Sequence, residues 1–328
     1  METVDCDLCG SSNYLPVVSQ TDILHKTTTE LFTVVKCLDC GLHYTNPRPN
    51  RSEIGEFYSK SYSFHSNRGW KSRIKTSFIW DIFKKFANSS FALIFFFLPP
   101  ISKFLASQLK SPIKDPVTEL VKKGEVKSFL DIGCGSGLSA HYWGTSSSLV
   151  SCNKHVNVFG LEQDEEACSS LNLQGIKCWQ SLDKVELGIS FDLIRMNWSL
   201  EHVHSPTEYF KFISERLNEN GTIVIGIPNN EGLLYRLAPS CLELPIHLYH
   251  FSIQDIKEYA SQFNLKVLDV KTFSYPSMFS VPVAEGLLPK DFLFSKSIFR
   301  AKRAMRFLKS FDEIGWGNDM LITLKKKI

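Results

Sequence analysis

The sequence predicts an α/β protein whose mostly parallel sheet has helices on both faces and follows a small cysteine-rich module. From Val117 onward, short apolar runs alternate with helical patterns, which predicts a parallel sheet with covered faces. An early run ends in a glycine-rich turn of the kind that lets a ligand approach the backbone. Two C-x-x-C pairs lie in the N-terminal segment, residues 1–50.

The composition of the 328-residue chain is that of a folded protein with room for one medium domain and a smaller one. Hydrophobic residues make up 43%, which excludes disorder, and the net charge of +3 gives no argument for nucleic-acid binding. The acidic start, Met1 to Asp5, lacks the basic and apolar regions of a secretory signal. The odd count of nine cysteines argues against a disulfide framework, so we expect a cytoplasmic protein.

The cysteines of residues 1–50 form two C-x-x-C pairs, each followed by a glycine that relieves the tight turn. Each pair can direct two thiolates at one metal ion, and two pairs complete a tetrahedral zinc site. Because cysteine fills all four positions, no coordination site stays open for a substrate, and Zn²⁺ is expected to be structural. A redox role is disfavoured because two pairs occur together. The expected ligands are Cys6, Cys9, Cys37 and Cys40.

Residues 51–116 are predicted to be a helical connector or lid, beginning with a short helix from Ile54 to Tyr62. The longest apolar run, Phe91 to Leu98, is far shorter than the roughly 20 residues of a membrane-spanning helix. Basic residues flank it, which is typical of a helix on a membrane surface and equally of a lid packed on the main domain. The basic and aromatic segment 292–311 is either a contact for an anionic substrate or a membrane, or a solvated helix face.

The main domain, residues 117–328, is expected to alternate strands and helices and to be separable from the cysteine module. Ser205-Pro206 and Ser252 are good helix caps, and Asp255 suits the first turn after Ser252. Helices are therefore expected to begin near Leu138, Asp164, Pro206 and Ser252. Strands are expected at Ser128–Asp131, Asn157–Glu162, Lys177–Trp179, Phe191–Met196, Thr222–Ile227, Lys266–Thr272 and Met320–Lys325.

The glycine-rich turn after the first of these strands carries Gly133, Gly135 and Gly137 at every second position. A dinucleotide site requires G-x-G-x-x-G beneath a pyrophosphate, but here the third glycine comes one residue early. Asp131, two residues before the first glycine, would repel a pyrophosphate and suits an ammonium group. The pattern therefore favours S-adenosylmethionine, which has a ribose and an α-amino acid but no phosphate. A dehydrogenase and a glycine turn without a ligand are the alternatives.

The second strand of the main domain ends in a carboxylate, Glu162. A carboxylate at the tip of a second strand is what the hydroxyls of a ribose require. We therefore expect Glu162 to bind the ribose of the cofactor.

Together these residues resemble a class I S-adenosylmethionine-dependent methyltransferase, and most closely the bacterial group with an N-terminal four-cysteine zinc ribbon. Many of that group resemble sugar or surface-polysaccharide methyltransferases. The resemblance implies a Rossmann-like seven-stranded sheet with helices on both faces and an antiparallel last strand at Gly317–Leu321. It covers nearly the whole chain and rests on both cysteine pairs, Asn46-Pro47-Arg48-Pro49, Phe57-Tyr58, Asp131–Gly137, Gly160-Leu161-Glu162, Phe191–Ile194, Leu200–Val203, Gly221 and Pro228-Asn229.

The resemblance also assigns cofactor roles residue by residue. Gln163 and Leu182 would flank the adenine, and Asn197 with Ser199 would line the floor where cofactor and acceptor meet. Tyr62, or Tyr58 in its place, would close over the cofactor carboxylate, unless these tyrosines pack on the ribbon. The residues expected to bind S-adenosylmethionine are Asp131, Gly133, Gly135, Gly137, Glu162, Gln163, Leu182, Asn197 and Tyr62.

Methyl transfer to a hydroxyl or to a carbon acid requires removal of a proton from the acceptor, and histidine is the default base. The resemblance places His202 after the fourth strand, facing the cleft. His247 and His250 precede a capped helix, on the side where strand ends form the site. Each is a candidate base, with a purely structural hydrogen bond as the alternative. Glu201 would orient the cofactor or the base.

The expected acceptor is a small molecule or a glycolipid, with a carbohydrate hydroxyl or carbon as the atom methylated. An RNA methyltransferase is a second hypothesis, but acidic residues of the ribbon offset its lysines, so nucleic acid is a less favoured partner. A scaffold without activity is a third, opposed by the intact glycine turn and Glu162. Peripheral contact with the inner face of a membrane, the acceptor's identity and the oligomeric state stay open.

Overall fold

The computed structural model describes residues 1–58, 116–137, 152, 156–292 and 298–327. Its strands are β1 (Tyr14–Gln20), β2 (Phe32–Cys37), β3 (His43–Thr45), β4 (Ser128–Ile132), β5 (Asn157–Leu161), β6 (Lys177–Trp179), β7 (Phe191–Asn197), β8 (Leu217–Pro228), β9 (Tyr249–His250), β10 (Leu265–Phe273) and β11 (Asp319–Lys326). Its α-helices are α4 (Pro116–Lys122), α6 (Glu165–Leu173), α7 (Pro206–Arg216), α8 (Leu233–Leu237), α9 (Ile253–Gln262), α10 (Ser280–Ala284) and α11 (Ile298–Asp312).

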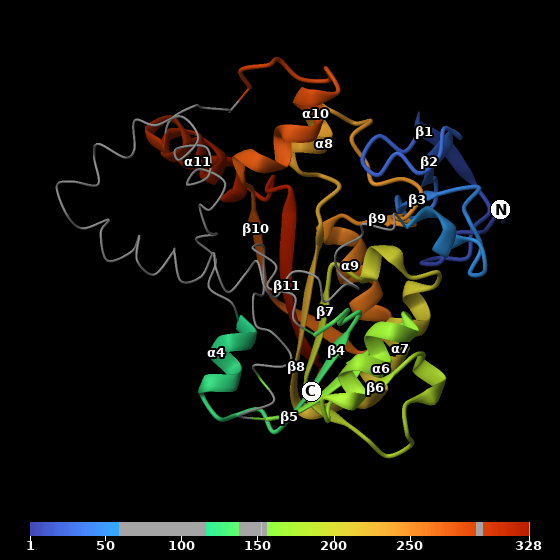
Figure 1. The fold of residues 1–328 in the computed structure, drawn as a ribbon, viewed down its shortest axis with the longest axis vertical. Coiled ribbons are helices and arrows are strands. Elements are labelled where there is room, and N and C mark those ends of the chain that lie inside the picture. The colour runs from blue at the N-terminus through green and yellow to red at the C-terminus, as the bar shows by residue number, and fades with distance from the viewer. Residues whose placement is uncertain (59–115, 138–151, 153–155, 293–297, 328) are drawn as a thin grey trace.

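A seven-stranded sheet in the order β10-β11-β8-β7-β4-β5-β6 forms the centre of the molecule (Figure 1). Strands β4 to β8 are parallel, whereas β11 runs antiparallel to both β8 and β10. Since β4, β7 and β8 are buried along most of their length, their sequences read as continuous apolar runs. The α/β prediction, including the antiparallel last strand, is confirmed.

Helices cover both faces of this sheet. On one face, Ile194 and Ile225 of the central strands share a buried cluster with Phe210 of α7 and Tyr259 of α9. On the other face, Val117 of α4 and Leu171 of α6 belong to a second buried cluster that also contains residues of β4, β7 and β8. The parallel strands therefore have both faces covered, as a sheet of this kind requires.

The observed boundaries agree with the sequence prediction except at a few positions. Strand β8 begins at Leu217 rather than Thr222, because an irregularity in its pairing with β7 extends the strand backward. Caps form at Asp164, Ser205 and Ser252 through side-chain bonds to helix N–H groups. The predicted helix near Leu138 lies outside the described residues.

The N-terminal module is a second sheet, ordered β1-β2-β3-β9, whose last strand comes from the main domain. The pairing of β3 with β9 joins His43 to His250 and Tyr44 to Tyr249. Asp7 accepts hydrogen bonds from the Ser205 hydroxyl at 2.8 Å and from the Tyr259 hydroxyl at 2.9 Å. In Figure 1 the module accordingly lies beside β9 and α9.

The two modules also share one hydrophobic core. Cys6, Leu42 and Tyr44 belong to the same buried cluster as Phe251 and Tyr259 of the main domain. The expectation that the two parts are separable is therefore wrong, because a strand of the main domain completes the N-terminal sheet. The predicted boundaries at residues 50 and 116 stay predictions.

Several expectations concern residues outside the description. Of the predicted helix Ile54–Tyr62, the structure describes a single 3-10 turn, Ile54–Phe57. The apolar run 91–98 and its basic flanks lie outside the described residues, as does Tyr62. In α11, which falls within the predicted segment 292–311, Leu308 is fully buried and Phe307 is half exposed.

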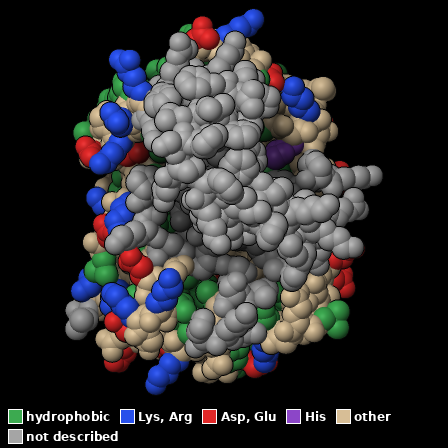
Figure 2. All heavy atoms as spheres, turned by 60° about the vertical axis from the view of Figure 1, so that its left-hand side comes forward, with side chains coloured by type: hydrophobic (Ala, Val, Ile, Leu, Met, Phe, Trp, Pro, Cys, Tyr) green, Lys and Arg blue, Asp and Glu red, His purple; other side chains and the backbone are tan. Residues whose placement is uncertain are grey.

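None of the helices among the described residues combines the length and the apolar character needed to cross a bilayer. On the face shown in Figure 2, lysine and arginine side chains are interspersed with aspartate and glutamate side chains along the edge. The described part of this face therefore carries mixed charge, in keeping with the small net charge of the chain.

Candidate functional site

A cleft of about 430 Å³ opens at the carboxyl ends of β4, β5 and β7. Ile132, Leu161 and Asn197 mark those three strand ends on its wall. In open α/β sheets, ligands bind outside the carboxyl ends of the strands, where the strand order reverses. Strand β4 lies between β5 and β7, so the cleft is at this reversal.

The glycine-rich turn forms one wall of the cleft, with Gly133, Gly135 and Gly137 all at positive φ. A Cβ on Gly133 would lie 2.4 Å from Cβ of Ser199, so only glycine fits there. The backbone N–H of Gly135 donates to the carboxylate of Glu162 at 2.7 Å. The turn is thereby fixed to the end of β5, with its backbone facing the cleft.

Glu162 borders the cleft and is 6% exposed. Oε2 accepts from the Gly135 N–H, and Oε1 accepts from the N–H of Asp164 at 3.0 Å. An ionised carboxylate has about four lone-pair sites, so these bonds leave capacity for further donors. Glu162 therefore holds the glycine turn in place and also borders the cleft, where it is predicted to bind ribose.

Asp131 has a different environment from the one the sequence predicts. Its carboxylate forms a two-bond ion pair with Arg195, with N–O distances of 2.8 and 2.6 Å. The two residues are paired in register on neighbouring strands β4 and β7, and both are about 2% exposed. Asp131 does not border the cleft among the described residues, and its carboxylate is turned to Arg195 rather than to a ligand.

The end of β7 and the residues after it also line the cleft. Asn197, Trp198 and Ser199 all border it, and the Ser199 hydroxyl donates to the carbonyl of Ile132 at 2.8 Å. Trp198 has a φ of 52°, a left-handed conformation that is rare for a bulky side chain. This backbone turn holds Trp198 in the wall of the cleft, a position the sequence does not signal.

His202 lies on the opposite wall of the cleft, next to Tyr58. Its Nδ1 is 3.0 Å from the carbonyl oxygen of Ile246 and 3.2 Å from the hydroxyl of Tyr58. Because a carbonyl only accepts, Nδ1 carries the hydrogen, and Nε2 keeps its lone pair. Burial, reinforced by the adjacent His247, lowers the pKa of His202 to about 3, so the ring is neutral.

A group of titratable side chains extends behind His202. The ring of His247 meets that of His202 edge to face, with centroids 4.7 Å apart. Nε2 of His247 and Nε2 of His25 each lie 3.5 Å from Oε2 of Glu243. Glu201 is 1% exposed, and burial together with Glu243 and Asp319 raises the pKa of its carboxyl well above the usual range.

The other residues predicted from the sequence lie in different parts of the structure. His250 is buried in β9, with Nε2 3.3 Å from the Thr45 hydroxyl, and among the described residues it is not part of the cleft wall. Leu182 packs against the main hydrophobic cluster instead of the cleft. Gln163 borders the mouth of the cleft. The position of Tyr62 is outside the description, while Tyr58, its stated alternative, borders the cleft.

The four N-terminal cysteines converge on one point. Sγ of Cys6 is 3.4 Å from Sγ of Cys40, Sγ of Cys9 is 3.6 Å from Sγ of Cys37, and all four lie within 4.8 Å of one another. Sulfurs bound at about 2.3 Å to a tetrahedral Zn²⁺ are about 3.8 Å apart, so the arrangement fits the ion. All nine cysteines of the chain are free, which leaves these four available as thiolates.

Comparison with known proteins addresses the cleft directly. A family model described as a methyltransferase domain matches residues 105–270, half of the chain. The chain belongs to this methyltransferase family. It is a class I S-adenosylmethionine-dependent enzyme. Most residues that line the cleft lie in the matched region, and those between Arg51 and Tyr58 precede it.

Solved structures similar to the methyltransferase include an O-methyltransferase from a trans-AT PKS multienzyme of Brevibacillus brevis in complex with S-adenosyl-L-homocysteine. It is 15% identical, with 66% of this chain and 82% of that chain covered and a TM-score of 0.40. An S-adenosylmethionine-dependent methyltransferase from Clostridium acetobutylicum is 14% identical, with 73% of this chain and 98% of that chain covered and a TM-score of 0.40. No curated protein matches the chain significantly.

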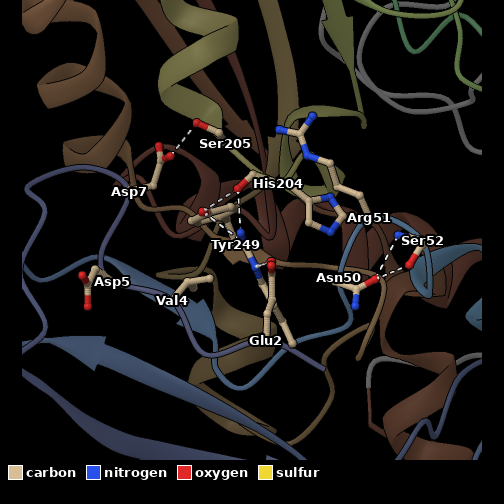
Figure 3. A pocket seen from close by; sticks show the side chains of 11 residues that line it. Glu2, Val4, Asp5, Asp7, Asn50, Arg51, Ser52, His204, Ser205 and Tyr249 are labelled. Carbon is tan, nitrogen blue, oxygen red and sulfur yellow. Dashed lines mark hydrogen bonds and ion pairs between the residues drawn. The ribbon is translucent and has the colours of Figure 1, made fainter.

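A second, shallower hollow of about 620 Å³ lies where the N-terminal module of the methyltransferase meets the main domain (Figure 3). Figure 3 shows Ser205 pointing toward Asp7, and Arg51 close to His204. Arg51, Ser52 and His204 border both this hollow and the cleft, so the two are neighbours.

Sequence reasoning missed several residues of this methyltransferase site. Trp198 lines the cleft and Arg195 pairs with Asp131, yet neither a tryptophan nor an arginine at these positions carries a specific sequence signal. Glu243 and His25 approach His247 from segments far apart in sequence. No spacing rule connects such segments, because their proximity depends on the tertiary fold.

Proposed function

We propose that this methyltransferase methylates a hydroxyl or a carbon of a carbohydrate, carried as a small molecule or on a lipid, in polysaccharide biosynthesis. The observation that carries the proposal is the hydrogen-bonding character of the cleft beyond the glycine turn. Tyr58, Asn197, Ser199 and His202 all border this part. An acceptor rich in hydroxyls can form further hydrogen bonds with these polar groups.

The cofactor side of the cleft is assigned to the glycine turn and the end of β5. The backbone of Gly133 and Gly135 borders the space for the methionine part, and Glu162 has acceptor capacity for ribose hydroxyls. Gln163, which borders the cleft, is proposed to lie beside adenine. Asp131 is paired with Arg195 and has no cofactor contact in this proposal.

His202, with His247 behind it, is proposed to draw the proton from the acceptor. The neutral ring of His202 has its Nε2 lone pair available, and the Ile246 carbonyl holds the ring orientation through Nδ1. S-adenosylmethionine supplies a methyl group on a sulfonium leaving group, so positioning of the acceptor and exclusion of water are the main tasks of the chain. His250 has no part in this proposal, since it bonds to Thr45 away from the cleft.

The second hollow extends the acceptor site in this proposal. Because Arg51, Ser52 and His204 border both spaces, an acceptor longer than one sugar can lie across them. Acidic and basic side chains both border the hollow, among them Glu2, Asp5 and Arg48. Such mixed polarity suits a neutral, hydroxyl-bearing chain better than a nucleic acid, whose phosphates require a basic surface.

A structural Zn²⁺ held by the four N-terminal cysteines completes the proposal. The ion would close a module whose strands are few, and the module in turn supports β9 and the residues leading to it. The nine free cysteines favour the reducing cytoplasm as the place of action.

The acceptor class is tested with S-adenosylmethionine carrying a labelled methyl group and a panel of sugar nucleotides, glycolipids and transfer RNA. We expect label on a sugar or glycolipid. Label on RNA alone contradicts the proposal.

The cofactor assignment is tested by calorimetry on Glu162→Gln. We expect affinity for S-adenosylmethionine to fall, because each charge-assisted bond to a ribose hydroxyl contributes about 1.5–3 kcal/mol at most. Glu166→Gln, an exposed change on α6, is the matched control. Unchanged affinity in Glu162→Gln would remove the ribose role.

A further inference from the structure

Three side chains at and behind the part of the cleft lined by His202 have the composition of a metal site. One ligand atom each from Glu201, His202 and His247 lie within 4.8 Å of one another. Glu201 and His202 belong to the 3-10 turn Leu200–His202 after β7, and His247 comes from the loop before β9. Two imidazoles and one carboxylate form a donor set that suits divalent transition metals.

Glu201 is the strongest indication that something is bound here. Both of its carboxylate oxygens are buried, and neither has a hydrogen-bond partner among the described residues. A buried carboxylate without a partner is costly, and proteins normally pair it or use it to bind a metal. The other buried carboxylates near the cleft differ, since Asp131 is paired with Arg195 and Glu162 accepts backbone N–H groups.

Both histidines have the second contact that usually orients a metal-binding imidazole. A metal-bound imidazole usually donates its second N–H to a carbonyl or a carboxylate, which fixes the ring and its tautomer. His202 does so through Nδ1 to the Ile246 carbonyl, which leaves Nε2, 4.0 Å from Oε1 of Glu201, as the ligand atom. His247 has Nε2 within 3.5 Å of Glu243, a second carboxylate beside the group.

A direct Glu201–His202 hydrogen bond does not account for the arrangement. The 4.0 Å between Oε1 and Nε2 exceeds hydrogen-bond range. Among the described residues, the ion pairs of Glu201 and Glu243 are with histidines, not with lysine or arginine. In the described part of the chain, these two carboxyl groups therefore have no lysine or arginine as an ion-pair partner.

We propose that Glu201, His202 and His247 bind a divalent transition-metal ion of the Mn²⁺, Co²⁺ or Zn²⁺ class. The proposal rests on the proposed acceptor class, since His202 borders the cleft. In this proposal Nε2 of His202 binds the ion, and His202 therefore does not act as the base. The bound ion takes the oxygen of the acceptor hydroxyl as a further ligand and lowers the pKa of that hydroxyl. The O–H bond breaks and its proton passes to water. The oxygen bonds to the methyl carbon while the carbon–sulfur bond breaks, and its electron pair stays on sulfur.

The experiment measures metal binding on the full chain without acceptor. One equivalent of Zn²⁺ is loaded first, because soft thiolates take it preferentially and occupy the four-cysteine site. Mn²⁺ and, separately, Co²⁺ are then titrated by calorimetry. We expect one further ion to bind to the wild type, and Glu201→Gln and His247→Asn each to weaken that binding more than about tenfold.

Glu219→Gln, an exposed change on β8, is the matched control and should leave the second ion's affinity unchanged. Circular dichroism melting of Glu201→Gln, an isosteric change, checks that the fold is intact. No second ion in the wild type, or undiminished binding in Glu201→Gln, overturns the metal site. If the ion is absent while sugar methylation occurs and is lost in His202→Gln, the proposed function stands and only the metal site falls.

Discussion

The two groups of metal-ligand type in this chain differ in how their members are brought together. The four cysteines form two short pairs, and their own knuckle turns direct the sulfurs inward. The group of Glu201, His202 and His247 joins adjacent residues with a third that is 45 positions away, the difference between 247 and 202. The first is recognisable from spacing, whereas the second exists only because the loop before β9 returns to the cleft.

The two groups also differ in what surrounds them. The cysteine group has four ligands of one kind, which complete a tetrahedral site and leave no position for a substrate. The Glu201 group has three ligand atoms, and His202 borders the cleft. In the two proposals, the closed group serves the fold and the open group serves the reaction.

The largest effect is expected from breaking the cysteine group. Structural Zn²⁺ contributes about 10–16 kcal/mol of apparent binding free energy in small zinc modules. Because the N-terminal sheet includes β9 and shares the main core, Cys37→Ser should lower the unfolding free energy of the whole chain by several kcal/mol. Urea unfolding of the full chain measures it.

Cys241→Ser is the matched control, since Cys241 is also buried and free but lies outside the group. It should cost only about 1–3 kcal/mol. Equal losses in the two variants would show that no metal is held by the cysteines.

The second effect is a difference in stability between variants of two buried carboxyl groups, Asp131, which has an ion-pair partner, and Glu201, which has no hydrogen-bond partner among the described residues. Asp131→Asn leaves Arg195 buried without its counter-charge, and breaking a buried pair costs about 3–5 kcal/mol. Glu201→Gln replaces a buried carboxyl whose oxygens have no hydrogen-bond partner among the described residues, so without the second metal it should cost less than about 1 kcal/mol or stabilise the fold. Urea midpoints of both variants, each loaded with one Zn²⁺, test this. A loss in Glu201→Gln as large as in Asp131→Asn would mean that Glu201 has a protein partner.

The smallest of the expected effects is a loss of stability at Asp22, in the turn that positions His25 next to Glu243. Burial opposes ionisation of Asp22, but hydrogen bonds from Thr27 and from the His25 N–H outweigh it and keep the pKa of Asp22 below its usual range. The stabilisation is therefore full above the unfolded pKa, about 3.9, and is lost as pH falls through the lower folded pKa.

Asp22→Asn should remove about 1–3 kcal/mol of stability at pH 7. The difference from wild type should shrink in urea titrations carried out below pH 4. A difference that is constant with pH would mean that the charge of Asp22 has no role in the turn.

The elements of the main sheet could be predicted because each depends on local pattern. The buried strands β4 and β7 have apolar runs, and caps such as Ser252 with Asp255 mark helix starts. The resemblance added the seven-stranded sheet and its antiparallel last strand, whereas the strand order came from the structure. Strand β9 was missed, because two residues that pair with β3 leave no periodic signal.

The candidate site was predictable only in part. Gly133 and Glu162 border the cleft as expected from the strand-turn pattern, although their roles stay proposals. Asp131 could not be read correctly, because Arg195 on the neighbouring strand takes up its charge, and cross-strand register is not visible in one sequence.

By itself, the sequence determined the local chemistry of this protein: the paired cysteines, the glycine turn followed by a strand-end acid, and the alternation that builds the sheet. These depend on neighbours a few residues away. Tertiary structure alone decided which buried charges are neutralised, since Asp131 meets Arg195 across two strands while Glu201 meets histidines of a returning loop. The reason is that electrostatic and coordination interactions act over a few ångströms in space and take no account of distance along the chain.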